Sequence, residues 1–509
     1  MAHTQSALTP RRNKARGTRS RTGCRTCRTD EVPLPSIRRI KCDESPGQCN
    51  NCLSANWKCD GYDPHRLPRG SSSRLRDMGS RIGWSMTVDE HRCFSYFQFH
   101  SIANLTRFFD SPLWQQLVLQ LSHSDPAVFH AVTMLSAAHQ ESEAHGMQIS
   151  EGTHRLSQWY YFSLQESTRA IGLLNKRRDS RDPQLRQVIL VCCLLFILSE
   201  VLLGHWDIAF THLRSGLHIL KELESHNQLE SEVEPSLVAV FRRLDIQSSL
   251  YGAEGPVLSL KYESSRQLFQ ASFEGFTSFT QVREELANLV EYGVPLFAGT
   301  RCLSSLDVEA ASESIYLVQG RLLGSFAQFA EHFKLFRKRH YQKFSEKERG
   351  GLDIVELIYL GHILALKILL LDGPVPKHFI PDFLVVLQAH EKKIDQLRRC
   401  SGLVMDHVII ANVYLVATRC PDPGIRLRAI YLLQSWPHYE GLHSSIVAAL
   451  MAFQALKRDF PDYETANSRV RMTKKDEKFL FESIKSMKNG AVQSVIPVVK
   501  MAERLYGCE

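Results

Sequence analysis

Residues 23–62 read GCRTCRTDEVPLPSIRRIKCDESPGQCNNCLSANWKCDGY, and they hold six of the 13 cysteines of the chain. The spacing is Cys-x2-Cys-x14-Cys-x6-Cys-x2-Cys-x6-Cys, and the six residues are Cys24, Cys27, Cys42, Cys49, Cys52 and Cys59. A Cys-x2-Cys pair places two thiolates within reach of one tetrahedral Zn²⁺, and no histidine lies inside the run to suggest a mixed site. The stretch therefore predicts a small zinc module with sulfur ligands alone.

Positive charge is concentrated around these cysteines. Residues 1–84 hold 17 Lys and Arg against 7 Asp and Glu, a net charge of +10, whereas the whole chain carries +8. The basic residues nearest the cysteines are Arg25, Arg28, Arg38, Arg39, Lys41 and Lys58. A compact metal module with many cations is suited to a polyanion, and double-stranded DNA is the first candidate.

Two further features, the polar start of the sequence and its most apolar run, bear on where in the cell the protein is expected. The first 23 residues are polar and basic, so no secretory signal is visible and we expect the thiols to lie in a reducing compartment. Clustered cysteines there bind metal more often than they form disulfides. The most apolar run, residues 188–198, is far shorter than the roughly 20 residues of a membrane span. We therefore expect a buried core helix there, with Cys192 and Cys193 as inert core thiols, and no membrane partner.

The chain divides into four predicted segments: a disordered basic arm (1–22), the cysteine module (23–62), a flexible linker rich in Pro, Gly, Ser and Arg (63–85) and an all-α domain (86–509). Ser111-Pro112, Asp125-Pro126 and Asp182-Pro183 each place a capping residue before a proline that suits the first turn of a helix. Later helices are predicted at about 354–372, 380–398, 403–417, 424–435, 440–456, 475–488 and 492–506. The fold class is therefore mostly α.

Enzyme signatures are missing from the sequence, so we predict no catalytic residues. It contains no Gly-x4-Gly-Lys-Ser/Thr, no His-Glu-x2-His and no Gly-x-Ser-x-Gly. His139 and His145 flank an acidic stretch and could suggest a metal site, but we interpret them as surface histidines at a helix end.

The cysteine stretch resembles the fungal binuclear zinc cluster (Zn2Cys6) transcription factors. Gly23–Arg28 and Arg38–Tyr62 carry the resemblance at nearly every position. It implies two Zn²⁺ ions, with Cys24 and Cys49 bridging both, Cys27 and Cys42 completing one site, and Cys52 and Cys59 completing the other. It also implies that Arg38 and Arg39 recognise a CGG triplet in the major groove, since the guanidinium fork fits guanine. Arg28 and Lys41 are assigned to phosphates, and Arg25 is a further expected DNA contact.

Residues from about 95 to 225 resemble the fungal-specific transcription factor domain that follows such clusters. The resemblance implies a nuclear, zinc-dependent regulator of RNA polymerase II transcription that binds CGG-type half-sites, with the helical domain tuning its output. In this family, control of a metabolic or secondary-metabolite pathway is common, and transcription coregulators are expected partners. A homodimer stays open, because no sustained heptad after the module predicts a coiled coil.

The sequence departs from the family at one place. About six residues separate the second and third cysteines in the family, and fourteen do here; removing Asp30–Ile37 restores the pattern. Either the insertion 30–37 is a gene-model error, or the module carries an additional loop. A rival arrangement holds one zinc with Cys24, Cys27, Cys49 and Cys52, leaving Cys42 and Cys59 as thiols. The alternative function is a helical interaction scaffold with a degenerate zinc module.

Overall fold

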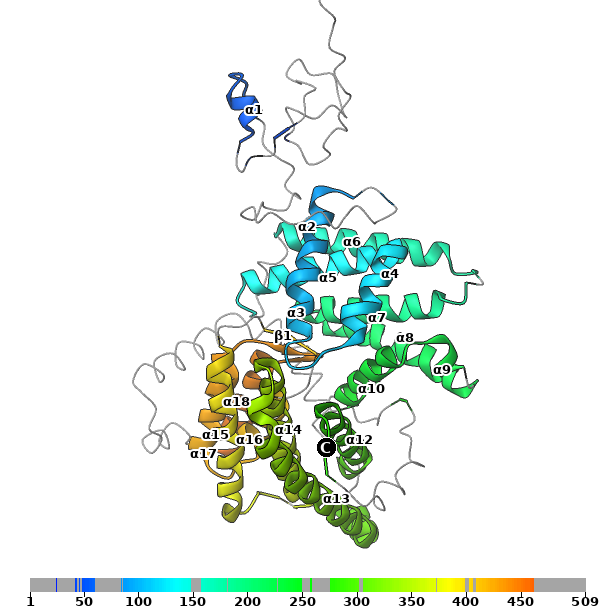
Figure 1. The fold of residues 1–509 in the computed structure, drawn as a ribbon. Helices are drawn as coiled ribbons and strands as arrows, with labels where there is room; N and C mark the ends of the chain where they lie inside the picture. Colours follow the sequence, from blue (N-terminus) through cyan, green and yellow to red (C-terminus); the bar gives the residue numbers. More distant parts are fainter. Residues whose placement is uncertain are drawn as a thin grey trace, which may run out of the picture. The chain divides into compact units, whose positions relative to one another are not determined.

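The structure is a computed structural model (Figure 1). It describes residues 24, 42–43, 45, 48–59, 84, 86–147, 157–180, 182–226, 228–249, 257–258, 275–301, 305–371, 373–398, 402–405 and 409–461. The chain separates into two units, residues 1–80 with 84–92, and residues 81–83 with 93–509. The predicted arm 1–22, the insertion 30–37, the linker 63–85 apart from Trp84, and the helices at 475–488 and 492–506 lie outside the described residues.

Two of the described helical segments begin in the first unit. The short helix α1 (Asn50–Leu53) belongs to the cysteine region. Helix α2 (Val88–Tyr96) begins in this unit with a capping box. The Thr87 backbone N–H donates to Glu90 Oε2 at 2.6 Å, and the Glu90 N–H donates to Thr87 Oγ1 at 3.2 Å. These reciprocal bonds satisfy two amide groups that a helix start otherwise leaves without acceptors.

The second unit begins with a layer of helices that pack mainly in sequential order. Helix α5 packs against α6 and α7, and α7 packs against α8. In chain order the elements are η2 (Phe97–Ser101), α3 (Ile102–Leu105), η3 (Leu113–Leu117), α4 (Val118–Ser124), α5 (Pro126–Ala144), α6 (Gln158–Lys176), α7 (Leu185–Leu202), α8 (Trp206–Ser225), α9 (Leu229–Glu232) and α10 (Pro235–Ser249). The predicted start of α5 is confirmed, because the Asp125 side chain accepts the Ala127 N–H at 2.9 Å ahead of Pro126.

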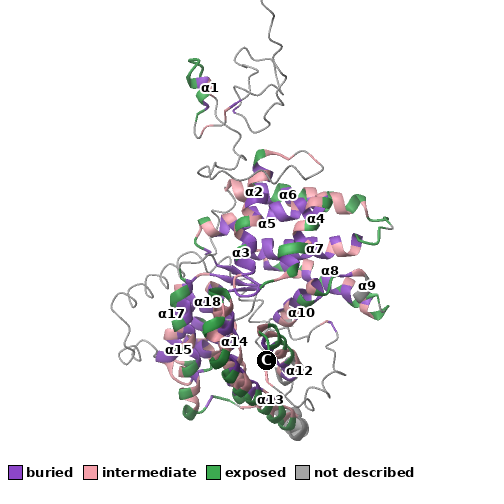
Figure 2. Cartoon of the chain, in the orientation of Figure 1, coloured by how far each residue is buried: buried purple, intermediate pink, exposed green. Residues whose placement is uncertain are grey.

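Helix α7 is the core helix of this layer, as the apolar run 188–198 predicts. Within the described part of the chain it is the one helix long and apolar enough to cross a membrane, and 83% of it is buried inside the protein. Figure 2 shows this burial along α7 and its neighbour α5. Cys192 and Cys193 are buried, and burial raises the pKa of both thiols, that of Cys193 to about 12. They are therefore inert core residues, as expected.

A second group of helices follows and shares one large apolar core. Its elements are α12 (Phe279–Arg301), α13 (Ser305–His340), η6 (Tyr341–Lys343), α14 (Glu346–Ile368), η7 (Lys377–Phe379), α15 (Ile380–Leu397), α16 (Ile410–Arg419), α17 (Pro423–Ser435) and α18 (Ser445–Asp459). Helices α16, α17 and α18 pack on one another, and α14 packs on α15. The mostly α prediction is confirmed.

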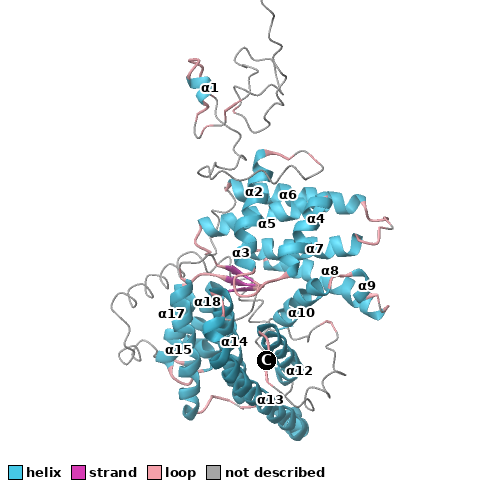
Figure 3. Ribbon diagram, in the orientation of Figure 1, coloured by secondary structure: helices cyan, strands magenta, loops and turns pink. Residues whose placement is uncertain are grey.

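A three-stranded sheet interrupts two of the predicted helices (Figure 3). Strand β1 (Leu403–Val404) pairs in parallel with β2 (Tyr439–Glu440), which pairs antiparallel with β3 (His443–Ser444). The predictions of helix from 403 and from 440 are therefore wrong at their starts, since α16 begins at Ile410 and α18 at Ser445. The buried Glu440 explains the first break: its carboxylate accepts the backbone N–H groups of Ile409 and Ile410 at 2.8 and 3.1 Å.

The turn between β2 and β3 joins this second group to the first layer of helices. Trp206 Nε1 on α8 donates to the Leu442 carbonyl at 3.3 Å, and the Leu442 N–H donates to Gln247 Oε1 on α10 at 3.0 Å. Gly441, at φ 58°, lies so close to Gln247 that an added Cβ would be 2.5 Å from its Oε1. Residues far apart in the chain are thus held in one unit by a short hairpin.

Candidate metal centre

The described cysteines of the N-terminal stretch converge. The sulfur atoms of Cys24, Cys42 and Cys49 lie within 4.8 Å of one another, and so do those of Cys24, Cys52 and Cys59. Cys24 belongs to both groups. All but Cys59 are buried, and among the described residues the apolar cluster that they form consists of cysteines alone. Cys27, the sixth predicted ligand, lies outside the described residues.

Local backbone geometry brings three of these thiols together. Cys49 is the N-cap of α1, and Cys52 lies in the same helical turn. Asn56 then adopts the left-handed conformation at φ 58°, and the Trp57 N–H donates to the Cys52 carbonyl at 2.9 Å. Asparagine tolerates this conformation better than most residues. The resulting reversal returns Cys59 to the helix start, where the Cys49 N–H donates to Cys59 Sγ at 3.4 Å.

Backbone N–H groups in the cluster favour the deprotonated, thiolate form of its cysteines. The Cys24 N–H donates to Cys42 Sγ at 3.3 Å. The pKa of Cys49 lies below its ordinary value: burial and a contact with Asp43 oppose this shift, and backbone N–H groups of Asp43 and Cys52 produce it. Asp43 itself accepts the Asn50 N–H at 3.1 Å, so its carboxylate is used at the start of α1.

The donor set can be compared with what a metal requires. Zinc–sulfur bonds of about 2.3 Å imply sulfur–sulfur separations of about 3.8 Å around a tetrahedral ion. The sulfur atoms of Cys24 and Cys52 lie 3.8 Å apart, and none of the described cysteines forms a disulfide. Buried sulfur ligands at such separations can hold a soft divalent cation. The residues present therefore fit a zinc-type site.

The predicted DNA contacts Arg25, Arg28, Arg38, Arg39 and Lys41 all lie outside the described residues. Of the basic residues near the cysteines, Lys58 is described, and its side chain is exposed beside Cys59. The geometry of the cluster therefore bears on the metal ligands and not on the contacts with DNA.

A second cluster of histidine and glutamate side chains lies in the helical unit, and His139 is the one member of it that the sequence pointed to. His139 is fully buried on α5, so its interpretation as a surface histidine is wrong. Burial, opposed by Glu143 and assisted by nearby His100, lowers its pKa to about 4. The sequence does show His139 and Glu143 four residues apart, a spacing that places both on one helix face. It does not show that His100, which comes from a separate element, lies beside them.

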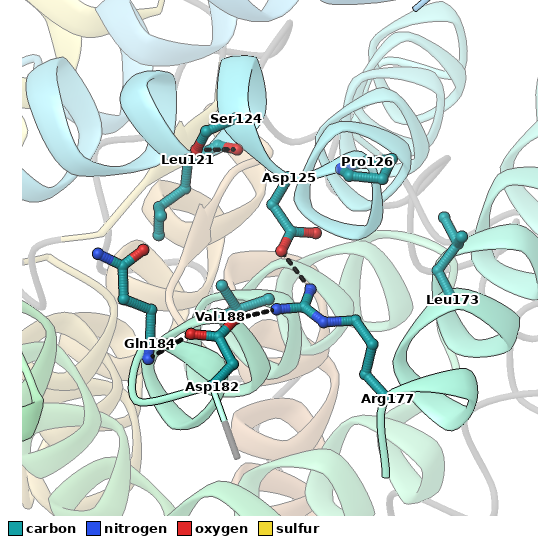
Figure 4. A pocket seen from close by; sticks show the side chains of 9 residues that line it. All are labelled: Leu121, Ser124, Asp125, Pro126, Leu173, Arg177, Asp182, Gln184 and Val188. Atoms are coloured by element: carbon teal, nitrogen blue, oxygen red, sulfur yellow. Dashed lines mark hydrogen bonds and ion pairs between the residues drawn. The ribbon is translucent and has the colours of Figure 1, made fainter. Parts of the chain in front are cut away.

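One cavity in the first helical layer is lined by charged side chains that pair with one another (Figure 4). It has a volume of about 370 Å³ and lies between the starts of α5 and α7. The Arg177 guanidinium contacts the carboxylates of both Asp125 and Asp182, the latter at 2.7 Å. The charged groups that line this cavity pair with one another. We therefore interpret these ion pairs as structural links between the ends of neighbouring helices.

Asp125→Ala should lower the free energy of unfolding by about 1–2 kcal/mol, since it removes both the cap of α5 and a partner of Arg177. Urea unfolding of the full chain measures the change. Asp182→Ala is the matched control, because Asp182 contacts the same guanidinium and also accepts a backbone N–H, from Gln184 at 2.9 Å, but from a more exposed position. Its effect should be smaller, and an equal or larger effect would contradict the assignment of the cap.

Comparison with known proteins identifies the helical region. A family described as "Fungal specific transcription factor domain" matches residues 92–285. The "Aspercryptin biosynthesis cluster-specific transcription regulator atnN" of Emericella nidulans is 26% identical over 47% of this chain and 41% of its own length. "Transcription regulator lscL" of Purpureocillium lilacinum is 26% identical over 38% of this chain and 49% of its own length.

A shorter match covers 12% of the chain. It is to the "Transcriptional regulatory protein moc3" of Schizosaccharomyces pombe, at 40% identity over 9% of that protein. No solved structure matches significantly. The chain thus spans less than half the length of the curated relatives it matches. Residues 92–285 thus match the fungal-specific transcription factor domain family, and the relatives named above are transcription regulators, not enzymes.

Proposed function

We propose that this protein is a zinc-dependent, sequence-specific DNA-binding regulator of RNA polymerase II transcription that acts in the nucleus. The observation that carries the proposal is the convergence of Cys24, Cys42, Cys49, Cys52 and Cys59 in the same chain as a fungal-specific transcription factor domain. The surrounding positive charge supplies affinity for phosphates. The first relative is named as the regulator of one biosynthesis cluster, which supports control of a metabolic or secondary-metabolite pathway here.

The proposed ligands are the six cysteines, holding two Zn²⁺ ions. Cys24 is shared between the two groups of neighbouring thiols, which supports its role as a bridging ligand. Cys42 and Cys59 each lie in one of these groups, and this favours two ions over the single-zinc arrangement that would leave both out. When bound, structural zinc cross-links the ligands and supplies much of the folding free energy of so small a module.

We assign the basic residues of the sequence to two kinds of DNA contact, with bases and with the backbone. Arg38 and Arg39 recognise a CGG-type half-site, whereas Arg25, Arg28 and Lys41 contact the backbone. The arm at residues 1–22 contributes six basic and no acidic residues and should make binding strongly dependent on salt. The helical domain would then modulate output through coregulators.

Replacing Arg38 and Arg39 together by alanine should weaken binding to a CGG-containing duplex by about 1–3 kcal/mol and leave binding to an unrelated duplex nearly unchanged. Fluorescence anisotropy with the full chain at two salt concentrations measures both. As the control, Arg11→Ala with Arg12→Ala should weaken binding to both duplexes alike and reduce the salt dependence. Undiminished affinity for CGG in the first variant would reject the assigned recognition.

The insertion at residues 30–37 favours one alternative, a helical interaction scaffold whose zinc module is degenerate. Pro33 and Pro35 within it cannot continue the helix that carries the base-reading residues in the family. Sequencing the transcript across codons 27–42 separates the two: absence of the eight codons removes the main support for the scaffold. If they are present, the DNA-binding measurement above decides between the proposals.

A further inference from the structure

A second group of metal-binding side chains lies in the helical unit, in the sequence segment that matches the transcription factor domain. The ligand atoms of His100, His139 and Glu143 all lie within 4.8 Å of one another. His100 Nε2 is 2.8 Å from Glu143 Oε1, and His139 Nε2 is 3.6 Å from the same oxygen. Two imidazoles and one carboxylate therefore face a common point.

Local structure explains how these residues meet. His139 and Glu143 are four residues apart on α5, so their side chains lie on one face of that helix. His100 belongs to the π-helical turn η2, which packs against α5. Single π-helical turns shift the register of a helix and occur frequently at functional sites. The π-helical turn η2 therefore places His100 against the face of α5 that carries His139 and Glu143.

Outer contacts hold His139 and Glu143 in place. Ser101 Oγ is 2.9 Å from His139 Nδ1, which leaves Nε2 as the ring atom directed at the carboxylate. The Tyr96 hydroxyl donates to Glu143 Oε2, so Oε1 is the oxygen directed at the two histidines. Metal-binding histidines and carboxylates commonly have such hydrogen-bonded supports.

His100 Nε2 and Glu143 Oε1 form a hydrogen bond, whereas the third ligand atom, His139 Nε2, lies farther from the same oxygen. The 3.6 Å between His139 Nε2 and Glu143 Oε1 exceeds hydrogen-bond length. Metal bonds of 2.0–2.1 Å to nitrogen and oxygen imply ligand separations of about 3.3 Å around a tetrahedral ion. His139 is fully buried, whereas the side chains of His100 and Glu143 are 43% and 26% exposed, so the cluster opens to solvent on one side. A cation can enter from that side.

We propose that His100, His139 and Glu143 bind one divalent transition-metal cation of the zinc class, separately from the cysteine cluster. Two histidines and one carboxylate form a donor set that zinc and its neighbours accept, with solvent in the remaining position. The bound ion links η2 to α5 and gives the regulatory domain a metal-dependent contact. The proposal does not depend on the contents of the cysteine cluster.

The test compares metal content between full-length chains that differ at one residue. Each chain is equilibrated with Zn²⁺, dialysed, and measured for zinc per chain by elemental analysis. His100→Gln should hold one ion fewer than the native chain, because it removes the most exposed ligand with little effect on packing. Glu143→Gln should show the same loss. Any zinc in the cysteine cluster cancels in the difference.

His205→Gln is the matched control. His205 is also a partly exposed histidine beside a carboxylate, with Nδ1 at 2.7 Å from Glu200 Oε2, but no second histidine among the described residues joins this pair. It should retain the native zinc content. With Co²⁺ in place of zinc, the native-minus-His100→Gln difference spectrum should show visible bands without a thiolate charge-transfer band. Equal zinc content in the native chain, His100→Gln and Glu143→Gln, with all three folded by circular dichroism, would overturn the proposal.

Discussion

Replacing Cys24 by serine should abolish specific DNA binding and release the zinc held by the cysteine module. Cys24 lies within 4.8 Å of all four other described thiols of the stretch, in two groups that share it. Loss of a bridging ligand disrupts both proposed metal sites at once. Structural zinc contributes about 10–16 kcal/mol to the folding of small zinc-finger peptides at neutral pH, so the module should unfold. Elemental analysis and anisotropy on the full chain measure zinc content and DNA binding.

Two control variants show whether the loss of zinc is specific to Cys24 and which metal arrangement is present. Cys193→Ser changes a buried cysteine of α7 far from the stretch in sequence, and it should leave the zinc content as in the native chain. Cys42→Ser separates the two metal arrangements: it should lower zinc content and DNA affinity if two ions are bound, and change neither if Cys42 is outside a single site. Native DNA affinity and zinc content in Cys24→Ser would refute the two-zinc proposal.

The cysteine cluster could be predicted because its information is local. The Cys-x2-Cys spacing around α1 brings Cys49 and Cys52 into one helical turn, and the reversal at Asn56 needs a single residue that tolerates positive φ. The helix starting after Asp125 and the core helix at 188–198 were predictable for the same reason, since capping and apolar periodicity are properties of short stretches.

The features that were missed depend on contacts distant in sequence. Strands β1 and β2 have two residues each, too few to show an alternating pattern, and they pair across more than 30 intervening residues. Glu440 reads as a surface residue, yet it is buried because it accepts the amides at the start of α16. His139 likewise reads as polar surface, and only the approach of η2 places His100 and Ser101 against it.

Gly361→Ala should destabilise the helical unit by about 3–5 kcal/mol, through overpacking and the loss of buried hydrogen bonds. Gly361 is buried in α14, and an added Cβ would lie 2.0 Å from Asn412 Oδ1 on α16. The Asn412 side chain cannot simply rotate away, because its Nδ2 donates to the Leu357 carbonyl at 3.0 Å and lies 3.4 Å from His390 Nε2. The methyl group therefore either separates α14 from α16 or leaves these buried polar atoms without their present partners.

Gly324→Ala is the matched control for this substitution. Gly324 also lies within a long helix, α13, but a Cβ added there would have no atom within 4 Å. Because alanine favours a helix interior over glycine, Gly324→Ala should stabilise the protein by about 0.5–1 kcal/mol. Thermal and urea unfolding of both variants measure the changes. Opposite signs would show that the close approach at Gly361, and not a general effect of glycine in helices, holds α14 against α16; similar values for the two variants would contradict that packing.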